Sequence, residues 1–230
     1  MANVFRNLDW SVATDVIARV AAALVCITFH ELAHGFTAYR LGDRTAKDMG
    51  RLTLNPIKHI DVFGLLMMIA FRFGWAKPVP VNMYNFRRPK WYMAITAIAG
   101  PLSNIILATV VAFIYGLLFT LLGGRGARGA GGFALDMMDT IAYLSIALAV
   151  FNMLPIPPLD GSKVLFSVLS EGAYFRLMRY ERYGMILLIV FINIDRFLDT
   201  TIFSDTVGRL TGILSDGLST VWFAAYRLVN

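Results

Sequence analysis

Three apolar blocks of the chain are long enough to cross a lipid bilayer. They run from Val12 to about Leu41, from Tyr92 to Leu122 and from about Leu135 to Met153. A helix needs about 20 mostly apolar residues to cross the hydrocarbon core. The pattern therefore predicts three transmembrane helices, the second of which is interrupted early by Gly100-Pro101.

Shorter apolar blocks lie between and after these three. Residues 61–73 are too few to cross a bilayer, so we expect a re-entrant or hairpin segment there. A further apolar block runs from Tyr183 to Ile194. Residues 198–229 could form another span or a surface helix, because charged residues interrupt their apolar pattern. The expected fold is an all-α integral membrane protein with about four to six membrane helices.

Two polar segments between the blocks are predicted to be extended. Residues 50–56 end in Asn-Pro and are typical of a short strand that leads into a turn. Residues 74–82 contain two prolines that disfavour a helix. We expect small edge strands here, to which an unwound peptide could add as a further strand. No repeat divides the chain, so we expect one polytopic domain over 1–230, with its core at about 12–170 and C-terminal helices at 183–230.

The composition agrees with a membrane protein. Hydrophobic residues make up 57% of the 230 residues and charged residues 16%, below the ~25% typical of soluble domains. The formal net charge is +6, but the basic residues lie between apolar blocks and form no continuous stripe. We therefore expect a lipid bilayer and no nucleic acid as the partner. Cys26 is the only cysteine, which excludes an intrachain disulfide.

Lysine and arginine are distributed unequally between the two expected sides of the membrane. If residues 61–73 enter and leave on one side, segments 40–59, 72–91 and 159–182 share that side and carry fourteen of these residues. The loop 123–132 on the opposite side carries two. Basic loops are typical of the cytoplasmic side. We therefore expect the C-terminal end of the first helix and the segment around residue 160 at one face, the cytoplasmic one.

The pattern His30-Glu31-x-x-His34 lies at the end of the first apolar block. Residues four positions apart share a helix face, so both histidines could bind one metal ion. Glu31 projects about 100° away from His30, close enough to reach a metal-bound water without binding the metal itself. This arrangement predicts a hydrolytic metal centre inside a membrane helix.

Asp160 is the candidate for a third metal ligand. Zinc hydrolases commonly use three protein ligands and one water. Prolines at 155, 157 and 158 break the helix before Asp160, and irregular backbone at membrane depth is tolerated where it lines a cavity. An Asp-Gly pair after prolines is also typical of a simple turn, so the spacing alone leaves both interpretations open.

Two other residues of ligand type have simpler interpretations. Cys26 lies four residues before His30 on the same helix face and could be a soft ligand, although a small buried packing residue is the commoner role. His59 stands near Asp61 in a polar loop. Hydrogen bonding is the usual role of such a histidine, and support of the metal site or gating of substrate is the alternative.

Two motifs of this chain carry a family resemblance: His30-Glu31-Leu32-Ala33-His34-Gly35, and Asn152-x-x-Pro155-x-x-Pro158-Leu159-Asp160-Gly161. Together they resemble the site-2 protease family of intramembrane zinc metalloproteases. Residues 51–61, 74–82 and 99–104 are similar to further elements of its small bacterial branch, which lacks a PDZ insertion. The resemblance covers most of the chain from 29 to 163.

The resemblance implies one zinc ion held by His30, His34 and Asp160, with Glu31 as general base. It implies hydrolysis of a peptide bond in or near a transmembrane helix of a single-span membrane protein. The implied location is the cell inner (plasma) membrane, with the site near its cytoplasmic side. Asn152 could then hydrogen-bond the substrate backbone or the developing oxyanion, or it could serve only as a helix-end amide.

Two other functions stay open at this point. A membrane metal-ion transporter could use the same histidines and aspartate as a transit site, but it would need no base at Glu31. A catalytically silent binding member of the family would be expected to lose Glu31 or one of the ligands, and the chain keeps all of them. The sequence indicates no oligomeric state.

Overall fold

The computed structural model describes residues 10–71, 76–124 and 128–229. Three of its helices are long and apolar enough to cross a membrane: Val16–Arg40 within α2 (Trp10–Arg40), α5 (Pro89–Leu121) and α6 (Gly129–Asn152). No residue in the described ranges belongs to a β-strand. The all-α membrane fold is confirmed; the described residues contain three candidate spans, and the expected number of four to six membrane helices is not confirmed.

Shorter helices connect these spans and follow them. Before α5 they are α3 (Thr45–Asp48), the 3-10 turn η1 (Pro56–His59), α4 (Val62–Phe71) and the 3-10 turn η2 (Met83–Asn85). After α6 they are α7 (Asp160–Ser167), α8 (Glu171–Tyr180), η4 (Glu181–Tyr183), α9 (Gly184–Ile192) and α10 (Ile194–Leu198), and the chain ends in the long helix α11 (Ile202–Val229).

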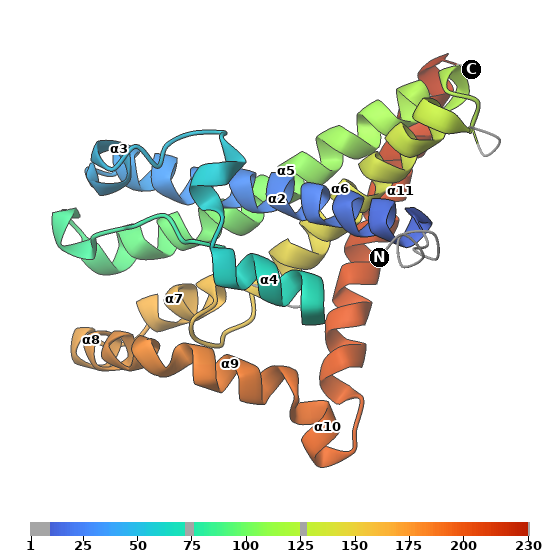
Figure 1. Cartoon of the computed structure of the whole chain (residues 1–230). Coiled ribbons are helices and arrows are strands. Elements are labelled where there is room, and N and C mark those ends of the chain that lie inside the picture. Colours follow the sequence, from blue (N-terminus) through green and yellow to red (C-terminus); the bar gives the residue numbers. More distant parts are fainter. Residues whose placement is uncertain (1–9, 72–75, 125–127, 230) are drawn as a thin grey trace, which may run out of the picture.

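Helix α5 lies at the centre of the molecule and contacts α2, α6, α7 and α11 (Figure 1). Its buried face consists largely of small residues, among them Ala97, Gly100, Ala108 and Gly116. Small residues let membrane helices approach closely, because little side chain separates the two backbones. At Gly116, an added Cβ would lie 2.4 Å from the carbonyl oxygen of Trp222 on α11. Helices α2 and α7 also pack against α5, so α5 brings these two helices close to each other.

The outward faces of the spans carry large apolar side chains. Such a surface is unusual in a soluble domain and typical of contact with lipid. The exposed residues on the first two spans include Val25, Phe29 and Phe36 of α2, and Ile95, Ile98, Leu102, Ile106 and Val110 of α5.

The C-terminal end of α2, the N-terminal end of α5 and helix α8 all lie at one end of the molecule (left in Figure 1). These elements carry four basic residues, Arg40, Lys90, Arg176 and Arg179. The structure therefore places several basic residues at one end of the molecule.

Three local expectations are corrected by the structure. Helix α5 runs unbroken through Pro101, because neighbouring membrane helices can support a backbone that lacks one hydrogen bond. Residues 50–54 and 76–82 form no strands, because no backbone–backbone hydrogen bonds of a ladder join these two described segments. Asn55 does begin a turn: its side chain accepts a hydrogen bond from the Ile57 amide and caps η1. Residues 72–75 lie outside the described ranges.

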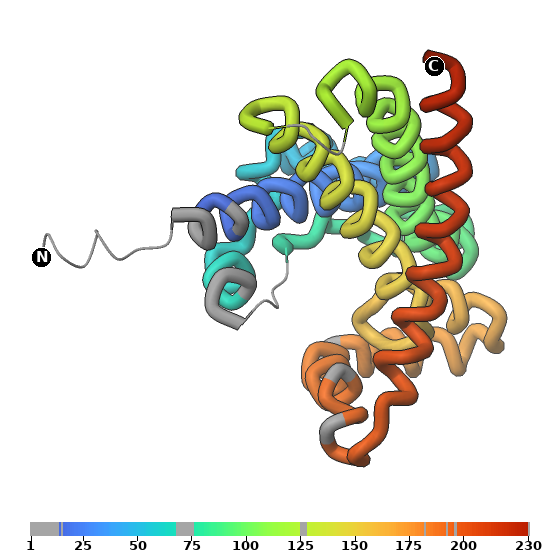
Figure 2. The backbone as a smooth tube through the Cα atoms, turned by 90° about the vertical axis from the view of Figure 1, so that its right-hand side faces the viewer, coloured from blue at the N-terminus to red at the C-terminus, as the bar shows by residue number. Residues whose placement is uncertain are grey.

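Helix α11 lies against two of the candidate spans. It packs along α5 and α6 for much of its length, and Figure 2 shows it running beside both. Asp205, Arg209 and Asp216 interrupt its apolar pattern, and it is not among the candidate spans. Helix α4 has ten residues, about 15 Å in length, which is half of what a bilayer crossing needs.

Candidate metal centre

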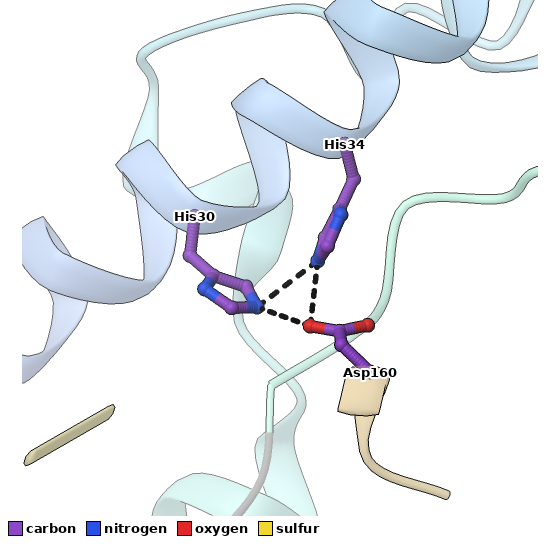
Figure 3. Close-up of side chains that lie close together, drawn as sticks. All are labelled: His30, His34 and Asp160. Carbon is purple, nitrogen blue, oxygen red and sulfur yellow. Dashed lines mark hydrogen bonds and ion pairs between the residues drawn. The ribbon is translucent and has the colours of Figure 1, made fainter. Parts of the chain in front are cut away.

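His30 and His34 on α2 meet Asp160, the first residue of α7 (Figure 3). Asp160 Oδ2 lies 3.1 Å from Nε2 of each histidine, and the two Nε2 atoms lie 3.0 Å apart. All three residues are buried, with 5%, 9% and 7% of their surface exposed. Ligand atoms about 2 Å from a tetrahedral zinc lie about 3.3 Å apart, so the three atoms fit the corners of one zinc site.

The histidines are held in the form that binds a metal through Nε2. His34 Nδ1 lies 2.7 Å from the Thr96 carbonyl oxygen, to which it donates its proton. The amide nitrogen of Asn104 lies 3.4 Å from His30 Nδ1, and among the described residues the buried Asn104 Oδ1 has no hydrogen-bond partner. With that oxygen turned toward His30, the Nδ1–H has an acceptor too. In both rings Nε2 then carries a free lone pair, the usual arrangement of metal-binding histidines.

Gly100 provides the space for both histidine rings. A Cβ at this position would lie 2.4 Å from His34 Nε2 and 2.7 Å from His30 Cε1. No side chain larger than hydrogen fits there while the rings keep their positions. The glycine of Gly100-Pro101 is therefore a packing requirement of the site, although the sequence suggested a helix interruption.

Asp160 reaches the histidines because the chain turns sharply after α6. The backbone of Gly161 packs against the end of that helix, where an added Cβ would lie 2.2 Å from the Met153 carbonyl oxygen. Burial raises the pKa of the Asp160 carboxyl, but the facing imidazoles of His34 and His30 and the nearby Lys163 ammonium lower it more. The net pKa of Asp160 lies below its ordinary value, so the carboxylate is ionised, which is the form that binds metals.

Glu31 is held by a segment from outside its own helix. Its Oε2 accepts a hydrogen bond of 2.7 Å from the Val79 amide. Val79 is buried in the middle of residues 76–82, an extended segment that we call the strap. The strap lies across the α2 turn that carries Glu31, and Gly35 on this helix makes room for it: a Cβ there would lie 2.9 Å from Val79 Cγ1.

Two side chains anchor the strap at its ends. Arg51 Nη2 donates to the carbonyl oxygens of Lys77 and Pro78, at 2.8 and 3.2 Å. Asp43 Oδ2 accepts from the Asn82 amide at 2.7 Å, and its Oδ1 accepts from Thr45 and Asn85. Burial raises the pKa of Asp43, but these hydrogen bonds outweigh it and keep the pKa below its ordinary value.

The other candidates from the sequence lie elsewhere or make local bonds. Cys26 packs on α6, where its sulfur accepts from Ser145 Oγ, and within the described residues the metal-binding group contains only His30, His34 and Asp160. His59 Nε2 lies 3.0 Å from the Thr53 carbonyl oxygen, as expected for a loop histidine. Asn152 donates to the Leu148 carbonyl oxygen of its own helix, and its role toward substrate stays a prediction.

Several contributors to the site were missed by the sequence interpretation. Thr96, Gly100 and Val79 act through backbone atoms or through the lack of a side chain, and no residue pattern marks such roles. Asn104 did carry a signal, since a buried amide within a membrane helix is costly and usually has a function. In the sequence, Lys163 looks like one of the basic residues of a loop, and nothing there indicates its contact with Asp160.

The site combines two buried histidines of a candidate membrane span with a buried aspartate from α7, and Glu31 follows the first histidine directly. This set of side chains is typical of a metallohydrolase in a membrane protein. The sequence comparisons agree. A model of peptidase family M50 matches residues 126–193, which include Asp160. No solved structure matches the chain.

Relatives from bacteria and archaea extend the match. "Putative zinc metalloprotease YwhC" of Bacillus subtilis is 42% identical over 174 residues, covering 74% of this chain and 78% of its own. "Putative zinc metalloprotease MJ0611" of Methanocaldococcus jannaschii is 32% identical over 169 residues, covering 72% and 77%. "Putative zinc metalloprotease Rip2" of Mycolicibacterium smegmatis is 29% identical, and the match spans 65% of its length. The chain belongs to peptidase family M50, the site-2 protease family.

Proposed function

We propose that this protein is an intramembrane zinc metalloendopeptidase that cleaves a peptide bond in or near a transmembrane helix of a membrane-anchored substrate. The observation that carries the proposal is the convergence of His30, His34 and Asp160, whose ligand atoms lie within 4.8 Å of one another on and beside a candidate membrane span. These three residues would hold one zinc ion. Zinc at such a site polarises a carbonyl and lowers the pKa of a bound water.

Glu31 is the general base in this proposal. It follows the ligand His30 directly, and it takes a proton from the attacking water and later gives it to the leaving amine. The Val79 amide donates to Glu31 Oε2 at 2.7 Å, which restricts rotation of the carboxylate and would leave its second oxygen available to a metal-bound water. The strap is thus part of the catalytic arrangement, because it limits the rotation of the base.

The depth of the site supports cleavage near one membrane surface. His34 lies six residues before Arg40, the end of α2, a distance of about 9 Å along a helix. That end of the molecule carries several basic residues, so we place it at the cytoplasmic face of the cell inner (plasma) membrane. The expected substrate is a single-span membrane protein whose helix unwinds near this face, since a folded helix hides its peptide bonds in internal hydrogen bonds.

Removal and return of the metal test the proposal. Treating the purified, reconstituted protein with 1,10-phenanthroline should abolish cleavage of a single-span model substrate, and added Zn²⁺ should restore it. Mg²⁺ should not restore it, because a site of two imidazoles and one carboxylate favours zinc over hard cations that prefer oxygen ligands. Full cleavage by protein shown to be free of metal would contradict the assignment.

The strap gives a second prediction, at Arg51, whose hydrogen bonds go to the strap and not to His30, His34 or Asp160. Arg51→Met removes both hydrogen bonds to the strap carbonyls, and hydrogen bonds from a charged donor are worth about 1.5–3 kcal/mol. We expect kcat to fall roughly tenfold or more, with zinc content unchanged, because Glu31 loses its fixed orientation. Arg51→Lys should recover part of the rate. Loss of zinc together with activity would show that Arg51 supports the whole site and not the strap alone.

A further inference from the structure

Lys163 lies one helical turn after Asp160 on α7 and approaches the side of the carboxylate that the histidines do not use. Its Nζ is 3.8 Å from Asp160 Oδ1, whereas Asp160 Oδ2 is the atom 3.1 Å from both histidines. Residues three positions apart share a helix face, which explains the approach. The two oxygens of one carboxylate therefore have different partners: a cation on one side and two imidazoles on the other.

A second carboxylate holds Lys163 in place. Glu181 of η4 lies with its Oε1 3.5 Å from Lys163 Nζ. The side chains are only 22% and 26% exposed, so water screens this pair less than it would a surface pair. Glu181 comes from the segment that joins α8 to α9, and the ion pair connects this segment to the element that supplies the third ligand.

We propose that Lys163, held by Glu181, is a positioning residue that keeps Asp160 bound to the metal through Oδ2 alone. This inference rests on the proposed zinc protease function. A free carboxylate can turn to offer both oxygens to a metal. The charge of Lys163 on Oδ1 opposes that turn and leaves one coordination position for water, which a hydrolytic zinc site needs.

The charges around the site support the same assignment. With Zn²⁺ bound and both histidines neutral, the carboxylates of Glu31, Asp160 and Glu181 balance the zinc ion and Lys163, so the group carries no net charge. A neutral group is favoured where the surroundings have a low dielectric constant, because an unbalanced buried charge is costly. Removing the lysine charge would leave the zinc site with an excess of negative charge and a carboxylate oxygen without a partner.

The test uses four variants of the full-length protein: Lys163→Met, Lys163→Arg, Glu181→Gln and the double variant Lys163→Met/Glu181→Gln. Glu171→Gln, an exposed acid on α8, is the matched control. For each we would measure zinc affinity by competition with a chelator, the absorption spectrum of the Co²⁺-substituted protein, and kcat and KM. Unfolding of the metal-free protein reports on any purely structural effect.

We expect Lys163→Met to strengthen zinc binding by roughly tenfold, because Oδ1 becomes free to join Oδ2 on the metal and a positive charge near the ion is lost. The Co²⁺ spectrum should shift, kcat should fall more than KM changes, and Lys163→Arg should restore most of each property. Glu181→Gln should have a smaller effect of the same sign. It should have none when Lys163 is already Met, because Glu181 acts through Lys163.

Two results would overturn the inference. Equal effects of Glu181→Gln with and without Lys163 would show that the two residues act separately. Unchanged zinc affinity and Co²⁺ spectrum, with a less stable metal-free protein, would show that the pair only joins two segments. Failure of the protease function looks different, because the unmodified protein would then bind no zinc or cleave no substrate.

Discussion

Replacing Glu31 with Gln is expected to reduce the cleavage rate by about 10²–10⁴-fold, the usual contribution of a general base, while zinc stays bound. Gln has the same shape and can still accept the hydrogen bond from the Val79 amide through its side-chain oxygen. It cannot take a proton from water. Because Glu31 is not one of the three converging ligands, the metal site should be unaffected.

The measurement combines zinc content with cleavage of a single-span substrate in reconstituted vesicles. Asp48→Asn serves as the control, since this exposed carboxylate lies at the same end of the molecule and forms a surface ion pair with Arg44 at 4.0 Å. The same variant separates proteolysis from transport, because a transit site for metal ions needs no base. Zinc-loaded Glu31→Gln protein that cleaves at the normal rate would refute the role of Glu31.

Gly100→Ala is expected to lower zinc affinity by 100-fold or more, an effect of about 2.7 kcal/mol or more, without changing any ligand. The added methyl would lie 2.4 Å from His34 Nε2 and 2.7 Å from His30 Cε1, so it forces at least one ring away. The rings cannot both move and still present Nε2 to one ion with Asp160. Alanine is also the better helix former by about 1 kcal/mol, so the helix itself should not be weakened.

Zinc affinity and the Co²⁺ spectrum would be compared between Gly100→Ala and Gly212→Ala. The second glycine lies on α11 with no atom within 4 Å of an added Cβ, so it controls for the change in helix propensity. Gly212→Ala should bind zinc normally. Normal zinc binding by Gly100→Ala would mean that the histidine rings do not lie against α5 in the metal-bound protein.

Sequence reasoning succeeded where the signal lies within one element. Both ends of α2 and the C-terminal end of α6 fall close to the expected positions, because the length of an apolar block is a local property, although α6 begins at Gly129 and not at Leu135. The spacing of His30 and His34 placed both on one face for the same reason. The amino-acid pattern failed at residues 50–54 and 76–82, because a strand exists only with a paired neighbour, and the pairing partner is not a local property.

The position of Asp160 was predicted only in part. It lies 126 residues after His34, and the count of basic residues predicted only that both lie at the same membrane face. The structure brings their atoms to 3.1 Å through the packing of α7 on α5. Gly161, packed on the end of α6, is one of the close contacts that make this approach possible.

The sequence by itself determined the three candidate membrane spans, the histidine pair and the adjacent glutamate. Each depends on helix periodicity or on the length of an apolar block, and both are set by neighbouring residues. Only the tertiary structure decided that Gly100 makes room for the histidine rings and that the Val79 amide holds Glu31. It also decided that Lys163 lies beside Asp160 and pairs with Glu181. These roles belong to backbone groups and side chains brought together from distant segments, and only the packed molecule defines their distances.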